Sequence, residues 1–318
     1  MILQPCRKRF RILSNSFKIT VLGSSAAIPS QKRACASQWI TCNNRSLLID
    51  CGEGTQMQLR KFGIHFQRIS HILISHLHGD HFLGLPGLLS TMNLLGRNQG
   101  LKVYGPAPLQ TILETFFQLS DTQINFNYEF IPVRTKERTL IFEDTGMRIW
   151  AFPLKHRIET YGYSIEEKQL RLKVDKAKAE AFNLQPTHFK FLSQGIDFEL
   201  MDGTKIDHSD FTLPTHPNRM YSYCSDTAPF EKLASHLTGT TTLYHEATFL
   251  ESEKARAIQT FHSTAMDGAQ IAKSLGVKNL LLGHLSSRYP DGQKHTEEAK
   301  TIFQNSETVE DGQTYEIL

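Results

Sequence analysis

Short apolar runs alternate along this chain with longer stretches in which apolar residues recur at helical spacing. Residues 17–22 (Phe-Lys-Ile-Thr-Val-Leu) alternate partly at every second position and end at Gly23, as a half-buried strand does. Residues 47–50 and 71–75 are apolar runs that stop at polar or glycine-rich turns. Such continuous runs are typical of strands that are buried on both faces of a sheet.

Predicted helices and further strands follow in both halves of the chain. Residues 84–96 and 108–119 have apolar positions at helical spacing, and 101–104 returns to a strand pattern between them. Alternation of this kind predicts an α/β (α+β) fold in which a core sheet lies between helices. The remaining predicted elements are strands at 125–133, 148–154, 221–224, 242–244 and 279–282, and a helix at 264–275.

The stretch at about 166–217 interrupts this alternation. It is rich in Lys, Glu, His and Asp, has few long apolar runs, and contains a lysine-bearing helix pattern at 175–182. A segment of this composition contributes little to the main core, so we predict that it projects from a single domain spanning 17–318. Residues 1–16 are predicted to form a short basic N-terminal extension.

The composition sets only loose bounds on function. The 318 residues are 40% hydrophobic and 21% charged, and a net charge of +3 neither requires nor excludes a nucleic-acid partner. No apolar run is long enough to span a bilayer and no secretory signal is present, which predicts a soluble, intracellular protein. Five scattered cysteines argue against a disulfide framework and a thiolate zinc knuckle.

Four metal-ligand side chains fall within six residues, directly after the predicted strand at 71–75. They are His76, His78, Asp80 and His81, and imidazole and carboxylate groups are suitable ligands for zinc. A single histidine at a strand end is usually structural. Three neighbouring imidazoles repel one another when they are charged, and that repulsion needs compensation. The cluster therefore predicts a metal-dependent hydrolase site, and its crowding suits two metal ions better than one.

Further residues of ligand type follow three other predicted strands. His156 comes after the strand at 148–154, Asp226 after the strand at 221–224, and His284 after the strand at 279–282. Each would be a weak candidate alone. Together they indicate strands that converge on one edge of the fold and complete two metal sites.

Several motifs surround these candidates and identify a family. They are Leu-Pro-Gly at 85–87, Asp-Cys-Gly-Glu-Gly-Thr at 50–55, His-Glu-Ala-Thr at 245–248, His-Ser-Thr at 262–264 and Gly-His-Leu-Ser-Ser-Arg at 283–288. The histidine motif resembles the metallo-β-lactamase superfamily. The whole set, from about residue 18 to 289, resembles more narrowly the tRNase Z family.

The resemblance implies a four-layer αββα sandwich that holds two zinc ions per subunit, with manganese as the alternative metal. A hydroxide between two such ions is a nucleophile at neutral pH. Asp80 is implied as a proton acceptor in addition to its role as a ligand. The implied ligands are His76, His78 and His156 for one ion, Asp80, His81 and His284 for the other, and Asp226 as the bridge.

His262 is implied to be catalytic rather than a ligand. It would donate a proton to the departing ribose oxygen or hydrogen-bond the scissile phosphate, and Glu246 would either orient it or cap the adjacent turn. His245 is the remaining histidine most suited to support a ligand from behind. The residues implied to contact the substrate are Lys32, Arg33, Glu246, Ser263, Thr264 and Arg288.

The implied activity is removal of the 3′ trailer from precursor tRNA, which leaves a 3′-hydroxyl on the tRNA and a 5′-phosphate on the trailer. The insertion at about 166–217 would be the flexible arm (exosite) that grips the tRNA elbow, in a cytoplasmic homodimer. Two alternatives are a small-molecule esterase, lactonase or thioesterase of the same superfamily, and a metal-binding regulatory protein without turnover. The intact ligand set disfavours the second alternative.

Overall fold

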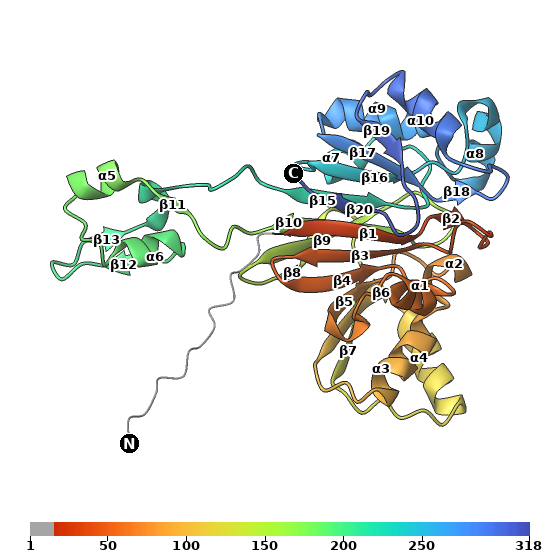
Figure 1. Ribbon diagram of the computed structural model, residues 1–318, viewed down its shortest axis with the longest axis horizontal. Helices are drawn as coiled ribbons and strands as arrows, with labels where there is room; N and C mark the ends of the chain where they lie inside the picture. The colour runs from red at the N-terminus through yellow and green to blue at the C-terminus, as the bar shows by residue number, and fades with distance from the viewer. Residues whose placement is uncertain (1–15) are drawn as a thin grey trace.

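Two seven-stranded β-sheets lie face to face at the centre of the protein (Figure 1). This computed structural model describes residues 16–318, so the predicted N-terminal extension at 1–16 lies outside the described residues except for Ser16. The first sheet comes mainly from the N-terminal half and has the order β20-β1-β3-β4-β5-β6-β7. Its strands are β1 (Phe17–Gly23), β3 (Ser37–Cys42), β4 (Arg45–Ile49), β5 (Ile69–Leu73), β6 (Leu101–Pro106), β7 (Tyr128–Val133) and β20 (Thr314–Glu316).

The second sheet comes from the C-terminal half and has the order β19-β17-β16-β15-β10-β9-β8. Strands β15, β16 and β17 are parallel to one another, whereas β10 is antiparallel to both of its neighbours, β9 and β15. Strand β9 therefore runs in the same direction as β15, β16 and β17. The strands are β8 (Thr139–Glu143), β9 (Met147–Pro153), β10 (Tyr161–Glu167), β15 (Met220–Cys224), β16 (Thr242–Glu246), β17 (Asn279–Gly283) and β19 (Ser306–Thr308).

Helices cover the outer face of each sheet, so the four-layer sandwich expected from the sequence is confirmed (Figure 1). None of the helices in the described part of the chain has the length and apolar character needed to cross a membrane. On the first sheet lie α1 (Thr55–Lys61), α2 (Gly79–Phe82), α3 (Leu85–Leu94) and α4 (Pro108–Leu119), and on the second α7 (Leu233–His236), α8 (Lys254–Thr260), α9 (Ala265–Leu275) and α10 (Gln293–Lys300).

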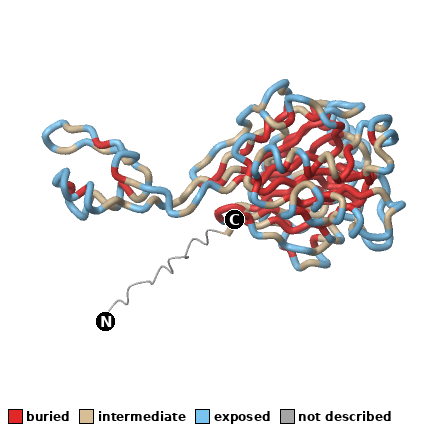
Figure 2. Tube along the Cα trace, turned by 90° about the horizontal axis from the view of Figure 1, so that it is seen from above, coloured by how far each residue is buried: buried red, intermediate tan, exposed pale blue. Residues whose placement is uncertain are grey.

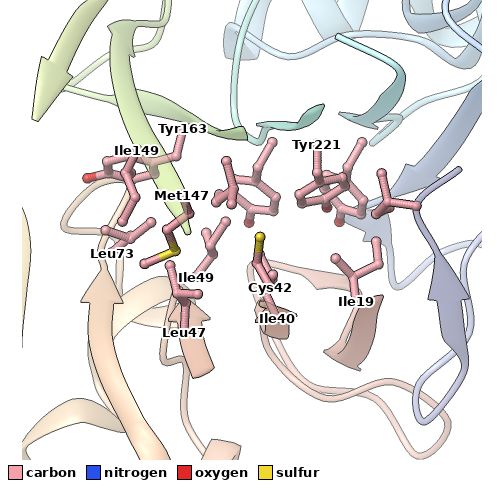
Figure 3. Close-up of a cluster of buried hydrophobic side chains, with 14 of the residues drawn as sticks. Ile19, Ile40, Cys42, Leu47, Ile49, Leu73, Met147, Ile149, Tyr163 and Tyr221 are labelled. Carbon is pink, nitrogen blue, oxygen red and sulfur yellow. The ribbon is translucent and has the colours of Figure 1, made fainter. Parts of the chain in front are cut away.

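The central strands are apolar on both faces because each lies between two layers. In β4, Leu47 and Ile49 belong to the core between the two sheets, whereas Leu48 packs into the core beneath the helices. Successive side chains of a strand point to opposite faces, so both sets of positions must be apolar here. Figure 3 shows part of the inner core, where residues of the first sheet meet Met147, Ile149, Tyr163 and Tyr221 of the second.

The segment between β10 and β15 extends away from the sandwich, and we call residues 168–219 the arm (Figures 1 and 2). Most of its surface is exposed, and its few buried apolar residues form a small cluster of their own around Leu192 and Phe211. The helix pattern at 175–182 corresponds to α5, which the Asp175 side chain caps by accepting a hydrogen bond from the Lys178 amide. The arm contains β11 (Lys173–Val174), α5 (Lys176–Ala181), α6 (Phe189–Ser193), β12 (Phe198–Glu199), β13 (Lys205–Ile206), the 3-10 helix η2 (His208–Phe211) and β14 (Thr212–Leu213).

Short elements complete the rim of the sandwich. Strands β2 (Ser25–Ala26) and β18 (Leu285–Ser286) pair in parallel and bring the loop after β1 next to the loop after β17. Two 3-10 helices, η1 (Phe66–Arg68) and η3 (Glu251–Glu253), precede β5 and α8. The cysteines among the described residues are buried free thiols at Cys35, Cys42, Cys51 and Cys224.

Candidate metal centre and active-site cleft

The candidate ligands meet where the carboxyl ends of strands from both sheets come together. Of the first four, His76 and His78 lie in the loop between β5 and the short helix α2, and Asp80 and His81 lie in α2 itself. His156, Asp226 and His284 follow β9, β15 and β17, which all run in the same direction and therefore end at the same edge of the second sheet. The two sheets are tied together here, because the Tyr161 amide donates to the carbonyl of Ser75 at 2.9 Å.

Two glycines allow the loop that carries the first four candidates to pack closely on the turn after β4. A Cβ on Gly52 would lie 2.1 Å from the carbonyl oxygen of Asp80, and a Cβ on Gly84 would lie 2.2 Å from that of Gly52. Backbone hydrogen bonds from Cys51 to His81 and from Gly84 to Cys51 use this close approach. Any side chain at either glycine would displace the loop and its ligands.

The first cluster contains His76, His78, His156 and Asp226, whose ligand atoms all lie within 4.8 Å of one another. His78 Nδ1 is 3.0 Å from His76 Nε2 and 3.3 Å from His156 Nε2. Asp226 Oδ2 is 3.5 Å from His76 Nε2 and 3.8 Å from His156 Nε2. Ligand atoms about 2.0–2.1 Å from a tetrahedral zinc ion lie roughly 3.3 Å apart, so this spacing fits such an ion.

The second cluster contains Asp80, His81 and His284, and it reaches the other oxygen of Asp226. His81 Nε2 is 3.2 Å from His284 Nε2, and each of these nitrogens is 3.4 Å from Asp80 Oδ2. Asp226 Oδ1 is 3.3 Å from His81 Nε2 and 3.2 Å from His284 Nε2. Asp226 thus directs one oxygen into each cluster, which is the geometry of a bridging carboxylate.

Hydrogen bonds to Nδ1, on the side of the ring away from the cluster, fix the orientation of His81 and His284. Asp50 accepts from His81 Nδ1 at 2.8 Å, and the same carboxylate accepts from the Ser75 amide, the Ser75 hydroxyl and the Tyr223 hydroxyl. The Thr248 hydroxyl lies 3.1 Å from His284 Nδ1. Partners of this kind set the tautomer so that the lone pair of Nε2 points into the cluster.

The sequence did not indicate Asp50 as a site residue, although it lies in the Asp-Cys-Gly-Glu-Gly-Thr motif. Its side chain is fully buried and its φ of 55° lies in the left-handed region. His245, which was considered as a support for a ligand, instead directs Nδ1 to the backbone carbonyl of Glu246 at 2.7 Å. The hydrogen bonds that support the ligand histidines His81 and His284 come instead from Asp50 and Thr248.

The electrostatic environment of the clusters favours a bound cation. Burial lowers the pKa of His76 to about 4 and also lowers the pKa of His78 and of His156, which keeps these imidazoles neutral. Burial opposes ionisation of Asp226, but the surrounding His284, His81 and His76 hold its pKa well below its usual range. Burial opposes protonation of His81, but the carboxylates of Asp226, Asp50 and Asp80 raise its pKa well above its usual range. The site therefore concentrates negative charge that a divalent metal ion would neutralise.

His262 lies beside the second cluster and is held by a buried carboxylate. Glu246, at the end of β16, has no exposed surface, and its Oε1 accepts from His262 Nδ1 at 2.8 Å. Burial alone would lower the pKa of His262, but the Glu246 carboxylate raises it to about 9. His262 also lies near Asp226 and His284. Its role as an acid therefore belongs to the function proposed below.

Glu246 has both of the roles that the sequence left open. Besides orienting His262, it accepts hydrogen bonds from the Thr227 amide at 2.7 Å and the Thr248 amide at 3.2 Å. It therefore also caps the turn after the bridging residue Asp226. Because it is fully buried, it does not contact the substrate, which corrects its assignment as a substrate-binding residue.

Ser263 and Thr264 were also predicted to contact the substrate, and the structure contradicts this. Both side chains are fully buried. The Ser263 hydroxyl donates to the carbonyl of Thr227 at 2.6 Å, and Thr264 forms a capping box with Asp267 at the start of α9. These hydroxyls hold the loop that carries His262 in place.

A cleft of about 600 Å³ opens above the two clusters. Arg288, which was predicted to contact the substrate, lines this cleft and lies over the ring of Phe249 with its guanidinium 3.1 Å from Glu253. Lys32 and Arg33 do not line it. Ile28 and Pro29 of the same loop do, and Arg33 turns away to donate to the carbonyl of Tyr289. The further residues of the cleft wall, which the sequence did not indicate, include Glu53, Arg157, Phe249 and Arg256.

The four-layer sandwich and the paired clusters at its edge define a protein of the metallo-β-lactamase fold with a candidate metal site. Over 288 residues the chain is 40% identical to a ribonuclease Z of Porphyromonas gingivalis. The alignment covers 91% of this chain and 95% of that protein. The chain belongs to the ribonuclease Z family.

Solved structures agree with this assignment. The short form of human tRNase Z superposes with a TM-score of 0.69 at 27% identity, covering 95% of this chain and 99% of that one. A metallo-β-lactamase fold protein of Bacillus subtilis has a TM-score of 0.66 at 19% identity, with coverage of 95% and 99%, and supports the fold alone. Residues 17–117 also match a family model described as anti-Pycsar protein Apyc1.

Proposed function

We propose that this protein is a zinc-dependent endoribonuclease that removes the 3′ trailer from precursor tRNA. The products are a tRNA with a 3′-hydroxyl and a trailer with a 5′-phosphate. The observation that carries this proposal is the pair formed by His262 and Glu246 beside the two ligand clusters. A protonated histidine next to a two-metal centre suits cleavage of a phosphodiester, because the departing oxygen needs a proton.

Two zinc ions held by the clusters would activate a water molecule as the nucleophile and stabilise the charge on the phosphoryl group. Manganese is the alternative metal, since the same ligands accept it. The proposed ligands are His76, His78 and His156 for the first ion, Asp80, His81 and His284 for the second, and Asp226 between them.

His262 donates its proton to the ribose 3′-oxygen as that oxygen leaves, and Glu246 keeps the ring charged and oriented until then. Asp80 serves as a ligand. Burial opposes its ionisation, but His81 and His284 hold its pKa below its usual range, so it is a poor proton acceptor. Its Oδ2 also accepts a hydrogen bond from the Ala27 amide at 2.8 Å, which fixes the carboxylate.

The arm supports tRNA as the substrate. A groove of about 890 Å³ on the arm is lined by Arg171, Lys173, Lys176 and Lys190, with Leu172 and Phe189 between them. Folded RNA is recognised largely by its shape and its phosphate backbone, which a basic groove on a projecting segment can contact. A small-molecule esterase, lactonase or thioesterase does not need a projecting basic segment to bind its substrate. A tRNA substrate agrees with the cytoplasmic location expected from the sequence.

A homodimer is part of the proposal. Large apolar side chains are exposed at the C-terminal end of α3 and on α4, namely Leu94, the C-cap residue Leu95, Ile112, Phe116 and Leu119. Exposed apolar surface of this kind marks protein–protein contacts, and α3 and α4 pack against one another. Sedimentation equilibrium of the native chain and of a Phe116→Glu, Leu119→Glu variant tests it, and a native monomer at micromolar concentration contradicts it.

The activity is tested with a 5′-labelled precursor tRNA, incubated with the pure protein with and without a chelator. We expect one cut near the discriminator base, lost with the chelator and restored separately by zinc or manganese. The product end is then mapped to show which fragment carries the phosphate. Equal hydrolysis of thioesters or bis(p-nitrophenyl) phosphate, without a cut in the tRNA, would support the small-molecule alternative instead.

A further inference from the structure

Three arginines line the cleft, and they differ in whether an acidic side chain is paired with the guanidinium group. Arg288 is paired with Glu253 at 3.1 Å. Arg157 and Arg256 are exposed and have no acidic partner within ion-pair distance among residues 16–318. Two guanidinium groups without a carboxylate partner therefore face a cleft that is built around a phosphodiester-cleaving centre.

Both arginines belong to the segments that position the proposed acid His262. Arg157 follows His156 directly, and His156 Nδ1 lies 3.0 Å from the carbonyl of Phe261, the residue before His262. Arg256 is on α8, which ends at Thr260 just before His262. Arg256 and Thr260 are four residues apart, so they share one face of α8, and both line the cleft. The rings of His156 and His262 are 5.1 Å apart.

The position of the two arginines beside His262 indicates which part of the substrate they face. His262 delivers a proton to the departing 3′-oxygen, and that oxygen belongs to the tRNA rather than to the trailer. The groups beside His262 therefore lie on the tRNA side of the scissile bond. In a polynucleotide, the group of opposite charge on that side is the backbone phosphate of the last tRNA nucleotide. Guanidinium binds such a phosphate through two parallel N–H···O hydrogen bonds.

We propose that Arg157 and Arg256 form a subsite that binds the backbone phosphate on the tRNA side of the scissile bond and so sets the cleavage position. The subsite rests on the proposed nuclease function and adds to it a group that the metal centre does not provide. A small phosphodiester has no second phosphate at this distance. The arginines therefore contribute to cleavage of a polynucleotide and not to the chemistry itself.

The first experiment compares Arg157→Gln, Arg256→Gln and the double variant with native protein on precursor tRNA and on bis(p-nitrophenyl) phosphate. For each single variant we expect kcat/KM on the tRNA to fall about tenfold further than on the small ester, as expected for one charge-assisted contact. The slope of log(kcat/KM) against log salt should become shallower by about 0.7 per arginine. Lys273→Gln, an exposed charge change on α9 away from the cleft, is the matched control.

The second experiment removes the charge from the substrate instead. A methylphosphonate at the linkage on the tRNA side should lower native kcat/KM by at least about tenfold, because both arginine contacts weaken, and lower that of the double variant much less. The same change one linkage into the trailer should affect both proteins equally. Equal sensitivity of both proteins to the first change overturns the subsite, and selective sensitivity to the second places the arginines on the trailer side and also overturns it.

The outcomes separate the subsite from the function on which it rests. If native protein makes no chelator-sensitive cut in precursor tRNA, the proposed function fails. If native protein cuts and the arginine variants cut at the same position with the same kcat/KM and the same salt slope, only the subsite fails. Zinc content is measured for every variant because Arg157 adjoins the ligand His156. If Arg157→Gln loses its metal, the test rests on Arg256→Gln and on the modified substrate with the native protein and that variant.

Discussion

The charge on Glu246 determines the protonation of His262, and the substitution Glu246→Gln tests this directly. The glutamine side chain keeps the size and one acceptor oxygen of the native one but removes the charge 2.8 Å from His262 Nδ1. Burial and the neighbouring His81 then lower the pKa of the imidazole, and Asp226, which acts more weakly than burial, still raises it. We expect the pKa of His262 to fall from about 9 in the native protein to its ordinary value of 6.5 or below.

The size of the effect follows from these two pKa values. At pH 7.5 a group whose pKa is about 9 is roughly 97% protonated, whereas one whose pKa is 6.5 is about 9% protonated. If His262 is the general acid, the variant is about tenfold slower at pH 7.5 from this cause alone. The sign follows from the role: an acid loses activity as the pH rises through its pKa, so the fall in activity moves to lower pH in the variant.

The assay is single-turnover cleavage of precursor tRNA between pH 5.5 and 10, with both proteins loaded with zinc. Bound metal ions would lower the pKa of His262 in both proteins, so the comparison rests on the difference between the two pH values at which activity falls. We expect that difference to be about two pH units or more. Activity of the variant should recover toward the native value near the acid end of the range.

A thermal-unfolding control accompanies the assay because Glu246 also accepts from the Thr227 and Thr248 amides. A glutamine NH2 group cannot accept, so we expect a loss of about 1–3 kcal/mol in the free energy of unfolding, and rates are measured well below the transition. If activity falls at the same alkaline pH in both proteins, and both are folded and loaded with zinc, the reasoning is refuted. That result would mean that Glu246 does not set the protonation of the acid.

Three further changes probe other parts of the site. His262→Ala should lower turnover on precursor tRNA by about 10²–10⁴ while both metal ions stay bound, and loss of metal in this variant would reassign His262 as a ligand. Asp50→Asn removes the carboxylate behind His81 and should weaken zinc binding about 10–100-fold in a competition with a chromogenic chelator, and unchanged affinity would contradict its role. Replacing the arm, residues 168–219, by a short turn should lower kcat/KM for precursor tRNA far more than for bis(p-nitrophenyl) phosphate, and equal losses on the two substrates would argue against tRNA binding by the arm.

Much of the sandwich could be predicted because its strands and helices have strong periodic patterns. The helix pattern at 108–119 coincides with α4. The pattern at 84–96 contains α3, which begins one residue later and ends two residues earlier. The strand expected at 125–133 begins only at Tyr128, because pairing with β6 starts there. Phe126, before the strand, is buried beneath the helices and therefore has the apolar character of a strand residue without its pairing.

The ligand candidates were visible in the sequence because each follows an apolar strand, and strand ends determine where polar side chains meet. Asp50 was not visible, since its role depends on partners such as Tyr223 that are distant in the sequence. The cleft arginines were missed for a related reason: Arg157 and Arg256 belong to no motif, and only the fold brings β9 and α8 to the same cleft. Ser263 was wrongly assigned because a motif contains structural residues as well as catalytic ones, and the sequence does not distinguish them.

The hydrogen bond between His156 and Phe261 connects the metal centre to the acid. His156 presents Nε2 to the first cluster and directs Nδ1 to the carbonyl of Phe261, so the orientation of its ring determines the position of that carbonyl. Phe261 has a φ of 59°, in the left-handed region that non-glycine residues rarely adopt, and it ends α8 directly before His262. A metal ion bound by His156 would therefore also stabilise the backbone that presents His262. Under the proposed function, the same hydrogen bond would link the metal centre to the position of the acid.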